Sequence, residues 1–275
     1  MMCAWKELLS VLPPWMRDDV DRLGKQTAQQ LWLRLGKPAF FVCQGRSISF
    51  GRALTADDLH FVVNAASRYS PWNASTMSHG YITAPGGHRI GICGEAVIKD
   101  GAVSGFRCVS SLHIRIARDF PGIAAKLAHL KGNLLILGKP GSGKTTLLRD
   151  LIRLRSQKEN VAVVDERAEL FPVGLDTGGS VDILTGCPKP WGIEMVLRTM
   201  GPDTVAVDEI TAPADCDALL QAGWCGVGVL ATAHGVDRRD LRSRRIYKPL
   251  VDSGLFEDLV ILHPDKSYHT ERMTL

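Results

Sequence analysis

The sequence predicts an α/β protein, with a parallel sheet flanked by helices in the second half of the chain and a smaller α+β domain before it. Three observations support this fold class. From Lys131 onward, apolar strand-like runs alternate with helical patterns, as in βαβ units. A glycine-rich segment, GKPGSGKT, lies between one such strand and the next helix. Before about residue 120, short runs separated by turn residues predict hairpins instead.

The first half is expected to hold hairpins and one helix. The helix is expected over Thr55–Tyr69, because Thr55 and Asp58 form a capping box and the apolar residues after them share one face. The runs before and after this helix, 31–50 and 81–117, alternate as strands do. The expected turns after the helix are PGG at 85–87 and KDG at 99–101.

The second half is expected to alternate strands and helices around one sheet. Its expected strands cover 133–138, 160–165, 204–209, 227–234 and 258–262. Its expected helices cover 144–155 and 192–200, each with an apolar face. The predicted domains are an arm domain (1–120), a linker helix (121–130) and a core domain (131–275).

Composition argues against several classes of protein. The 275 residues are 45% hydrophobic and 23% charged, which is ordinary for a soluble globular protein. The net charge of +4 is compatible with nucleic acid but does not require it. Seven scattered cysteines without a CxxC pair argue against disulfides and zinc. We expect reduced thiols in a cytoplasmic protein. The longest apolar stretch, 222–233, is too short to span a bilayer, so we expect any membrane role to depend on partners.

The segment from Gly138 to Thr146 predicts a phosphate cradle. It matches G-x-x-x-x-G-K-[ST] in full between a strand and a helix, which a chance glycine-rich turn does not explain. Loop amides and the helix N-terminus attract the anion. We expect Lys144 to contact the β- and γ-phosphates of ATP and Thr145 to ligate Mg²⁺. The expected cradle residues are Gly138, Lys139, Pro140, Gly141, Ser142, Gly143, Lys144, Thr145 and Thr146.

Two carboxylates end the strand TVAVDE. We expect Asp208 to hold Mg²⁺ through water and Glu209 to polarise the attacking water. The alternative, a pair of solvated acids at a strand end, loses weight because a phosphate cradle precedes this strand.

Polar residues end two further strands, and the carboxyl ends of parallel strands face the ligand crevice. Asp165 and Glu166 follow the strand after the cradle helix, so we expect them to share the site, with Asp165 as a candidate metal ligand. The alternative is a surface acid pair beside Arg167. His234, with Thr232, is a candidate sensor of the γ-phosphate; the alternative is a structural loop histidine.

Two groups of basic residues lie outside these strand ends. Arg89, Arg115 and Arg118 are candidates to place a cation on a γ-phosphate, on their own or a neighbouring subunit; the alternative is a solvated strand face. The segment RRDLRSRRIYK, 238–248, contains a single aromatic residue. Without interleaved aromatics, a solvated or subunit-facing surface is the better interpretation than a nucleic-acid interface.

With these residues placed, the chain resembles the type II/type IV secretion ATPases and, within them, the stage III sporulation protein AA family of endospore-forming bacteria. The resemblance runs from about residue 28 to the C-terminus. The cradle is common to many families, whereas SSLHIRIAR (110–118) and the long segment 187–210 are more particular. The other matching segments are 86–97, 138–151, 163–170 and 230–235.

The resemblance implies a RecA-like P-loop ATPase core in a six-subunit ring, with the arm of one subunit near the nucleotide of the next. It also implies a place on the mother-cell side of the forespore membranes, where the protein would energise a secretion-like complex of membrane proteins. Its motifs map onto this chain as Walker A (Lys144, Thr145), Asp box (Asp165, Glu166), Walker B (Asp208, Glu209), His box (His234) and arm arginines (Arg115, then Arg89 and Arg118).

The chain departs from the secretion ATPases at the Walker B strand. Those proteins usually end it in Gly-Glu, and their Asp-box glutamate is often held to order the water, whereas this chain has Asp208-Glu209. Either Glu209 or Glu166 is therefore a candidate base, and the strand geometry favours Glu209. Three other functions compete with the ring ATPase: a nucleic-acid-dependent ATPase, a small-molecule kinase and a non-hydrolysing scaffold. No arginine-rich lid supports the kinase, and the intact acid set argues against the scaffold.

Overall fold

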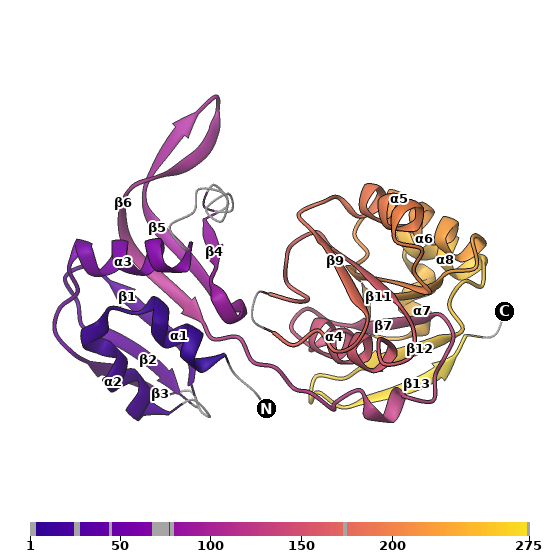
Figure 1. Ribbon diagram of the computed structural model, residues 1–275, viewed down its shortest axis with the longest axis horizontal. Coiled ribbons are helices and arrows are strands. Elements are labelled where there is room, and N and C mark those ends of the chain that lie inside the picture. The colour runs from indigo at the N-terminus through magenta and orange to yellow at the C-terminus, as the bar shows by residue number, and fades with distance from the viewer. Residues whose placement is uncertain are drawn as a thin grey trace. The chain divides into compact units, whose positions relative to one another are not determined.

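The computed structural model describes residues 4–24, 28–43, 46–67, 77, 80–172 and 175–273 (Figure 1). The chain divides into two compact units. The first is Met1–Asp119 with Pro172–Leu175, and the second is Phe120–Phe171 with Asp176–Leu275. Within the described residues, no helix has both the length and the apolar character needed to cross a membrane.

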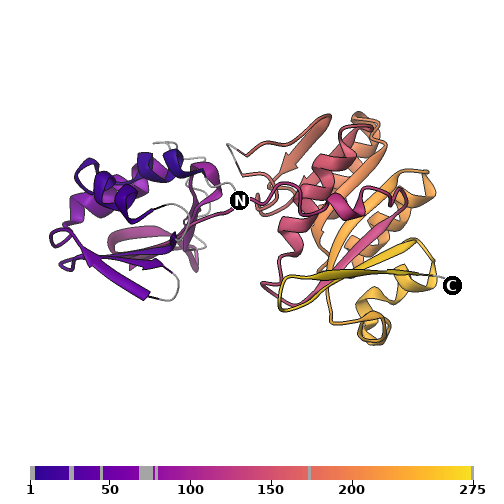
Figure 2. The same ribbon diagram turned by 90° about the horizontal axis from the view of Figure 1, so that it is seen from below.

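The first unit is an antiparallel sheet with helices on one side (Figure 2). In the described residues its strand order is β3-β2-β1-β6-β5-β4. The strands are β1 (Ala28–Arg34), β2 (Ala39–Cys43), β3 (Arg46–Phe50), β4 (Tyr81–Thr83), β5 (Arg89–Lys99) and β6 (Ala102–Arg115). The helices are α1 (Trp5–Val11), α2 (Pro14–Leu23) and α3 (Ala56–Ala66). Their apolar residues and those of the covered sheet face form one core, so this arm has a hydrophobic core of its own.

Two local signals in the first unit give the structure they predict. Thr55 caps α3 and Asp58 completes the capping box. The helix ends at Ala66, and residues 68 and 69 of the predicted helix lie outside the described residues, as does Cys3. The KDG turn joins β5 to β6, with positive φ at Asp100 (51°) and Gly101 (77°), as a tight hairpin turn requires.

The second unit has a mostly parallel sheet. In the described residues its order is β13-β12-β7-β11-β10-β8-β9, with only β13 antiparallel to its neighbour. The strands are β7 (Leu134–Gly138), β8 (Val161–Asp165), β9 (Val181–Thr185), β10 (Thr204–Glu209), β11 (Gly228–His234), β12 (Asp258–Leu262) and β13 (Tyr268–Arg272). The long apolar runs in this sheet follow from burial on both faces.

Helices cover the two faces of this second sheet (Figure 1). Alternate residues of the central strands point to opposite faces, so Leu134 and Ile136 join one core and Leu135 and Leu137 the other. On one face lies α4 (Lys144–Arg155). On the other face lie α5 (Lys189–Thr199), α6 (Pro213–Trp224), α7 (Arg238–Ser243) and α8 (Lys248–Asp252).

The segment predicted as a linker helix, 121–130, is not one. It contains turns and a short 3₁₀ helix, η3 (Ala125–Leu127), and it belongs to the second unit. The Asp150 carboxylate of α4 accepts the backbone N–H groups of Gly122 (3.0 Å) and Ala124 (2.8 Å). These two hydrogen bonds attach the segment to α4.

Candidate nucleotide site

Side chains from the predicted motifs meet at one edge of the second sheet. The strands β7, β8, β10 and β11 run parallel, so their carboxyl ends lie together. The glycine-rich loop follows β7. One acidic pair lies at the end of β8, and the other completes β10. The fold therefore brings together groups that are about a hundred residues apart in sequence.

The glycine-rich loop has the backbone that its glycines predict. Gly141 (φ 73°) and Gly143 (φ 107°) are left-handed, a conformation that side chains disfavour. A Cβ at Gly138 would lie 2.5 Å from Oγ of Ser142, so the turn needs glycine there. The Ser142 Oγ is buried and, among the described residues, has no hydrogen-bond partner. This loop fits a phosphate group, which would supply an acceptor for that hydroxyl.

The Lys144 ammonium is held by its own loop. Its Nζ donates to the carbonyl oxygens of Gly138 (3.0 Å) and Lys139 (3.3 Å) and to Nδ1 of His234 (3.0 Å). Burial lowers the pKa of Lys144, although the charges of Glu209 and Asp208 oppose that shift. The cation therefore lies at the phosphate loop in partly desolvated surroundings, where an anionic ligand would be attracted.

Two threonine hydroxyls converge on Asp208. The Oγ1 of Thr145 lies 3.2 Å from Oδ2 of Asp208, and the Oγ1 of Thr232 lies 3.2 Å from Oδ1. Burial, with the negative charges of Asp165 and Glu169, raises the pKa of Asp208 to about 6. The hydroxyl and carboxylate oxygens suit Mg²⁺, which also takes water and substrate phosphates as ligands. Among the described residues, no cluster of three or more His, Cys, Asp and Glu side chains could hold a metal by itself.

Glu209, His234 and Lys144 form a chain of contacts. The Oε1 of Glu209 lies 2.6 Å from Nε2 of His234, whose Nδ1 faces the Lys144 ammonium at 3.0 Å. An ammonium can only donate, so Nδ1 is the acceptor and the ring proton is on Nε2. That proton is donated to Glu209. The histidine thus connects the carboxylate at the end of β10 to the lysine of the phosphate loop.

The acids at the end of β8, Asp165 and Glu166, have different partners. Asp165 is buried, and its carboxylate accepts the backbone N–H groups of Glu169 (3.0 Å) and Leu170 (2.8 Å). It therefore organises the loop after β8, although it also lines the small cavity that contains Thr145, Asp208 and Glu209. Glu166 forms an ion pair with Lys189 at 2.5 Å.

A second cavity adjoins the phosphate loop. It has a volume of about 390 Å³ and lies between the loop residues Lys139–Ser142 and the turn that joins β12 to β13. His263 and Pro264 form part of its wall. The Lys266 ammonium in that turn donates to the Gly141 carbonyl, so the turn is attached to the tip of the loop.

Comparison with known proteins decides the family. A family model described as "Sporulation stage III, protein AA" matches residues 11–272. The chain belongs to this family. The protein "Stage III sporulation protein AA" of Bacillus subtilis (strain 168) is 36% identical over 271 residues, which cover 91% of this chain and 88% of that protein. The family indicated by the sequence motifs is confirmed.

Solved structures show the fold of this sporulation family member. The Legionella pneumophila ATPase DotB superposes with a TM-score of 0.58 at 19% identity, covering 95% of this chain and 80% of that chain. The pilus retraction motor PilT with bound ADP gives a TM-score of 0.62 at 15% identity, covering 94% and 78%. The predicted fold class, a RecA-like P-loop core preceded by an α+β arm, is confirmed.

Sequence reasoning missed one residue of the site in this sporulation family member. Lys189, the first residue of α5, is buried between Glu166 (2.5 Å) and Asp215 (3.6 Å). Asp215 in turn accepts backbone N–H groups at the start of α6. In the sequence, Lys189 stands out only as a lysine between two prolines at the start of a helix. That pattern gives no indication of the distant acidic partners of Lys189.

The predicted arm arginines belong to the first unit. Arg89 and Arg115 are directly opposite each other on β5 and β6, and they lie on the same side of that sheet. Arg89 also stacks on the ring of Tyr81, 4.0 Å from its centroid. The Arg118 guanidinium donates to the Ala28 carbonyl. A role for these arginines at a nucleotide stays a prediction.

Proposed function

We propose that the chain is a Mg²⁺-dependent ATPase. The observation that carries this proposal is the connected set of Lys144, His234 and Glu209 beside Thr145 and Asp208, all at one sheet edge. A lysine for phosphates, a hydroxyl and carboxylate for magnesium, and a second carboxylate for water are the parts that phosphoryl transfer to water needs.

Each residue has a distinct task in this proposal. On nucleotide binding, the Lys144 ammonium exchanges the Gly138 and Lys139 carbonyls for phosphate oxygens. Thr145 would be a ligand of Mg²⁺, and Asp208 would hold the ion through water. When bound, the ion neutralises charge on the transferring phosphoryl group. Glu209 accepts a proton from the attacking water, while the Nε2–H of His234 holds that carboxylate in position.

Glu209 is the better candidate for the base than Glu166. His234 couples Glu209 to Lys144, the residue that would contact the γ-phosphate. Glu166 is instead bonded to Lys189, and it would have to leave that ion pair to accept a proton from water. The nucleoside part of ATP would occupy the 390 Å³ cavity beside the loop, against His263 and Pro264.

The proposed setting is a ring of six subunits on a membrane-associated complex during endospore formation. Membership of the stage III sporulation family supports the cellular process. Similarity of fold to an ATPase and to a pilus retraction motor supports a mechanical use of ATP. In this proposal the chain is on the mother-cell cytoplasmic side, membrane proteins are its partners, and an arm arginine, Arg115 first, acts on a neighbouring subunit's nucleotide.

The test uses the Glu209→Gln variant, which should bind ATP but not hydrolyse it. We expect its solution mass to rise with Mg-ATP to that of a hexamer of the 30.0 kDa chain, and its turnover to be lost. Lys144→Ala is the matched control that should neither bind nor hydrolyse ATP. Ordinary turnover in Lys144→Ala would exclude the proposed site. If both the variant and the wild-type chain were monomeric in all conditions and the wild-type chain had full ATPase activity, the ring would be excluded. The proposed ATPase activity would still stand.

A further inference from the structure

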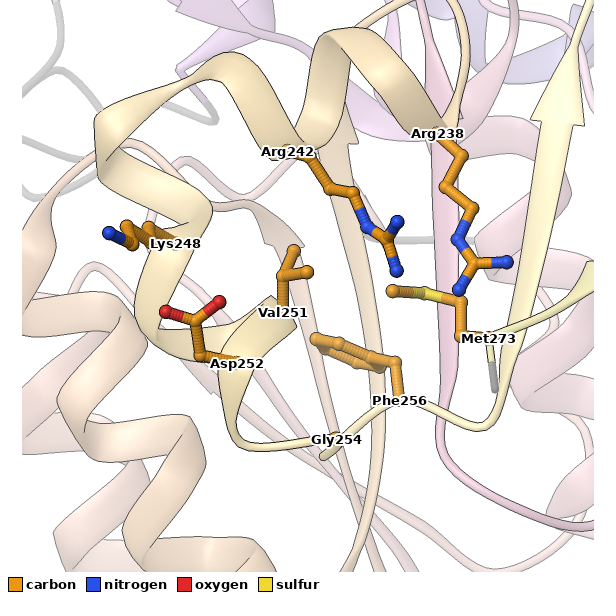
Figure 3. A pocket seen from close by; sticks show the side chains of 8 residues that line it. All are labelled: Arg238, Arg242, Lys248, Val251, Asp252, Gly254, Phe256 and Met273. Atoms are coloured by element: carbon orange, nitrogen blue, oxygen red, sulfur yellow. The ribbon is translucent and has the colours of Figure 1, made fainter. Parts of the chain in front are cut away.

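The basic segment 238–248 has no role in the proposed ATPase reaction, yet the structure gives it a defined form. Three of its cations, Arg238, Arg242 and Lys248, line a pocket of about 460 Å³ between α7, α8 and the chain segments that begin β12 and follow β13 (Figure 3). A volume of this size lies in the range of ligand pockets.

This pocket is separate from the candidate nucleotide site. Phe256 lies just before β12 and Met273 just after β13. In the sheet, Asp258 at the start of β12 pairs with Leu134 at the start of β7, whereas the phosphate loop follows the other end of β7. The pocket shares no residue with either cavity at the phosphate loop.

Asp252 lines the pocket, and three further acidic residues near it, Asp240, Glu257 and Asp258, are already bonded to other arginines. Asp240 forms a bidentate pair with Arg244, both contacts at 3.1 Å. Glu257 and Asp258 contact Arg272 at 3.4 Å. Among the described residues, no acidic side chain lies within ion-pair distance of Arg242 or Lys248. The fold therefore presents two cations at this pocket that its own acids do not neutralise.

The two arginines are arranged on one side of α7. Arg238 and Arg242 are one helical turn apart, and in Figure 3 both guanidinium groups point toward Met273. Arg238 donates to the Arg272 carbonyl at 3.4 Å, which ties it to β13. Like charges placed one turn apart cost stability unless an anion is shared between them. Planar guanidinium groups are suited to bidentate bonding of carboxylates.

The floor of the pocket is apolar and its rim has one acid. Phe256 is 1% exposed, and Val251 and Met273 are partly buried beside it. A methionine side chain adapts its shape to different apolar partners. The exposed Asp252 offers an acceptor at the rim. Cations, an apolar floor and one acceptor together match a peptide that carries an acidic and a large apolar side chain.

We propose that this pocket binds an acidic peptide segment of a partner protein. A carboxylate of the peptide pairs with Arg242, beside Arg238, and an apolar side chain next to it packs on Phe256, Val251 and Met273. Lys248 meets a second acid, and Asp252 accepts a backbone N–H of the peptide. The aromatic residues of this region, Phe256 and Tyr247, are buried, so the described residues that line the pocket offer no exposed base-stacking platform for a nucleic acid.

The test selects a random decamer peptide library against the full chain, and then measures the enriched peptides by fluorescence anisotropy. We expect enriched peptides with Asp or Glu next to Phe, Leu, Ile or Met. Arg242→Glu should weaken their binding by roughly tenfold or more, because a charge-assisted hydrogen bond is replaced by repulsion. Arg239→Glu, an exposed residue of the same helix that does not line the pocket, is the matched control and should change affinity less than about twofold.

Further measurements separate this proposal from its competitors. Arg242→Gln, which keeps the size of the side chain, should also weaken binding, and circular dichroism should show both Arg242 variants folded. The peptide proposal would be overturned if a single-stranded DNA or RNA 30-mer bound more tightly than the peptides and if Arg242→Glu abolished that binding. It would also be overturned by an enriched set without acidic and apolar residues, or by peptides whose affinity the Arg242 variants do not change. ATP turnover serves only as a folding control, since the pocket is proposed independently of hydrolysis.

Discussion

The Nε2 atom of His234 lies 2.6 Å from Oε1 of Glu209, and the other nitrogen of the same ring accepts from the Lys144 ammonium. This histidine is therefore the physical link between the candidate base and the phosphate loop. Because both ring nitrogens are engaged, each hydrogen bond of the imidazole polarises the other and strengthens it. Nucleotide binding, which is proposed to draw Lys144 toward phosphate, would free Nδ1 of His234 while the Nε2–H still holds Glu209.

His234→Ala should reduce the turnover number more than it reduces ATP affinity. Removing the imidazole leaves Glu209 without its donor, so we expect kcat to fall by roughly ten- to a hundredfold. His234→Gln is the matched variant, because its amide N–H can still reach Glu209, and it should recover part of the loss. Steady-state ATPase rates and equilibrium binding of a fluorescent ATP analogue give the two quantities. Equal losses of kcat in both variants would contradict the proposed role of the Nε2–H donor.

Lys189→Met should destabilise the second unit. The substitution leaves the buried Asp215 without its cation and breaks the pair with the half-exposed Glu166, so we expect a loss of about 1–3 kcal/mol. Lys158→Met, at an exposed position, is the control and should change stability by less than about 0.5 kcal/mol. Denaturant unfolding of Lys189→Met, Glu166→Gln and the double variant gives the coupling energy of the pair. Strict additivity would show that the 2.5 Å contact contributes no stability.

The sequence predicted the elements of the phosphate site more fully than it predicted the helices and linking segments around them. The helix over Lys144–Arg155 and the strand over Thr204–Glu209 have the predicted bounds, because a buried parallel strand and a helix with an apolar face leave strong local patterns. The α6 helix was not predicted, since its apolar residues merge with the glycine-rich run before β11. The prediction of a linker helix was wrong: the segment contains turns and the short η3 helix, and it is attached to α4 through Asp150.

The local sequence pattern could not predict the polar contacts of the site. That Lys189 is buried between two acids depends on the packing of α5 and α6 against the strand ends. The hydrogen bonds that backbone amides donate to Asp165 depend on the path of the loop after β8. Neither follows from residue spacing, because each joins groups whose separation is set by tertiary structure.

Arg115→Ala should be rescued by mixing if this arginine acts on a neighbouring subunit. The Lys144→Ala chain has an intact Arg115 but no competent nucleotide site, and the Arg115→Ala chain has the reverse. Each alone should be nearly inactive, and we expect a mixture to regain a clear fraction of wild-type turnover. Arg107→Ala, an exposed arginine of the same strand paired with Glu95, is the control and should retain activity. A mixture no more active than the separate chains would contradict action in trans.

Asp208→Asn should stabilise the protein when nucleotide and Mg²⁺ are absent. The folded-state pKa of Asp208 is about 6 and its ordinary value is 3.8, so the ionised carboxylate costs stability above pH 6. That cost is relieved as the pH falls through 6 and is gone below about pH 4. At pH 7.5 in EDTA we expect a gain of roughly 2 kcal/mol, which should vanish at pH 4. Thermal unfolding across this pH range, with Asp203→Asn as a control, checks whether Asp208→Asn raises the stability as expected.

The same titration makes a second prediction about ligand binding. Mg²⁺ needs the ionised carboxylate, so the affinity for Mg-ATP should fall as the pH decreases through about 6. In Asp208→Asn the affinity should be low throughout and nearly independent of pH in this range. Isothermal titration calorimetry at pH 5.5 and 7.5 distinguishes the cases. An equal pH dependence in both proteins would assign the titration to another group.

Asp58→Ala should destabilise the first unit, and the loss should depend on pH. Burial alone would raise the pKa of Asp58, but hydrogen bonds from Arg52, from the Thr55 backbone and from Trp15 lower it to about 2. Because the folded pKa lies below the ordinary 3.8, the stabilisation is complete above about pH 5 and is lost as the pH falls through 2.

At pH 7 we expect Asp58→Ala to lose about 2–3 kcal/mol, from the paired carboxylate and the helix cap together. Asp57→Ala, the exposed neighbour in the same helical turn, is the matched control and should lose less than about 1 kcal/mol. Denaturant unfolding of the first unit, followed by tryptophan fluorescence at pH 7, 4 and 2.5, measures the difference between the wild-type chain and Asp58→Ala. That difference should narrow at pH 2.5, because the wild-type carboxylate is then partly protonated and its bond with Arg52 weakened. A difference that stayed constant over this range would mean that Asp58 acts through packing and neutral hydrogen bonds instead of through its charge.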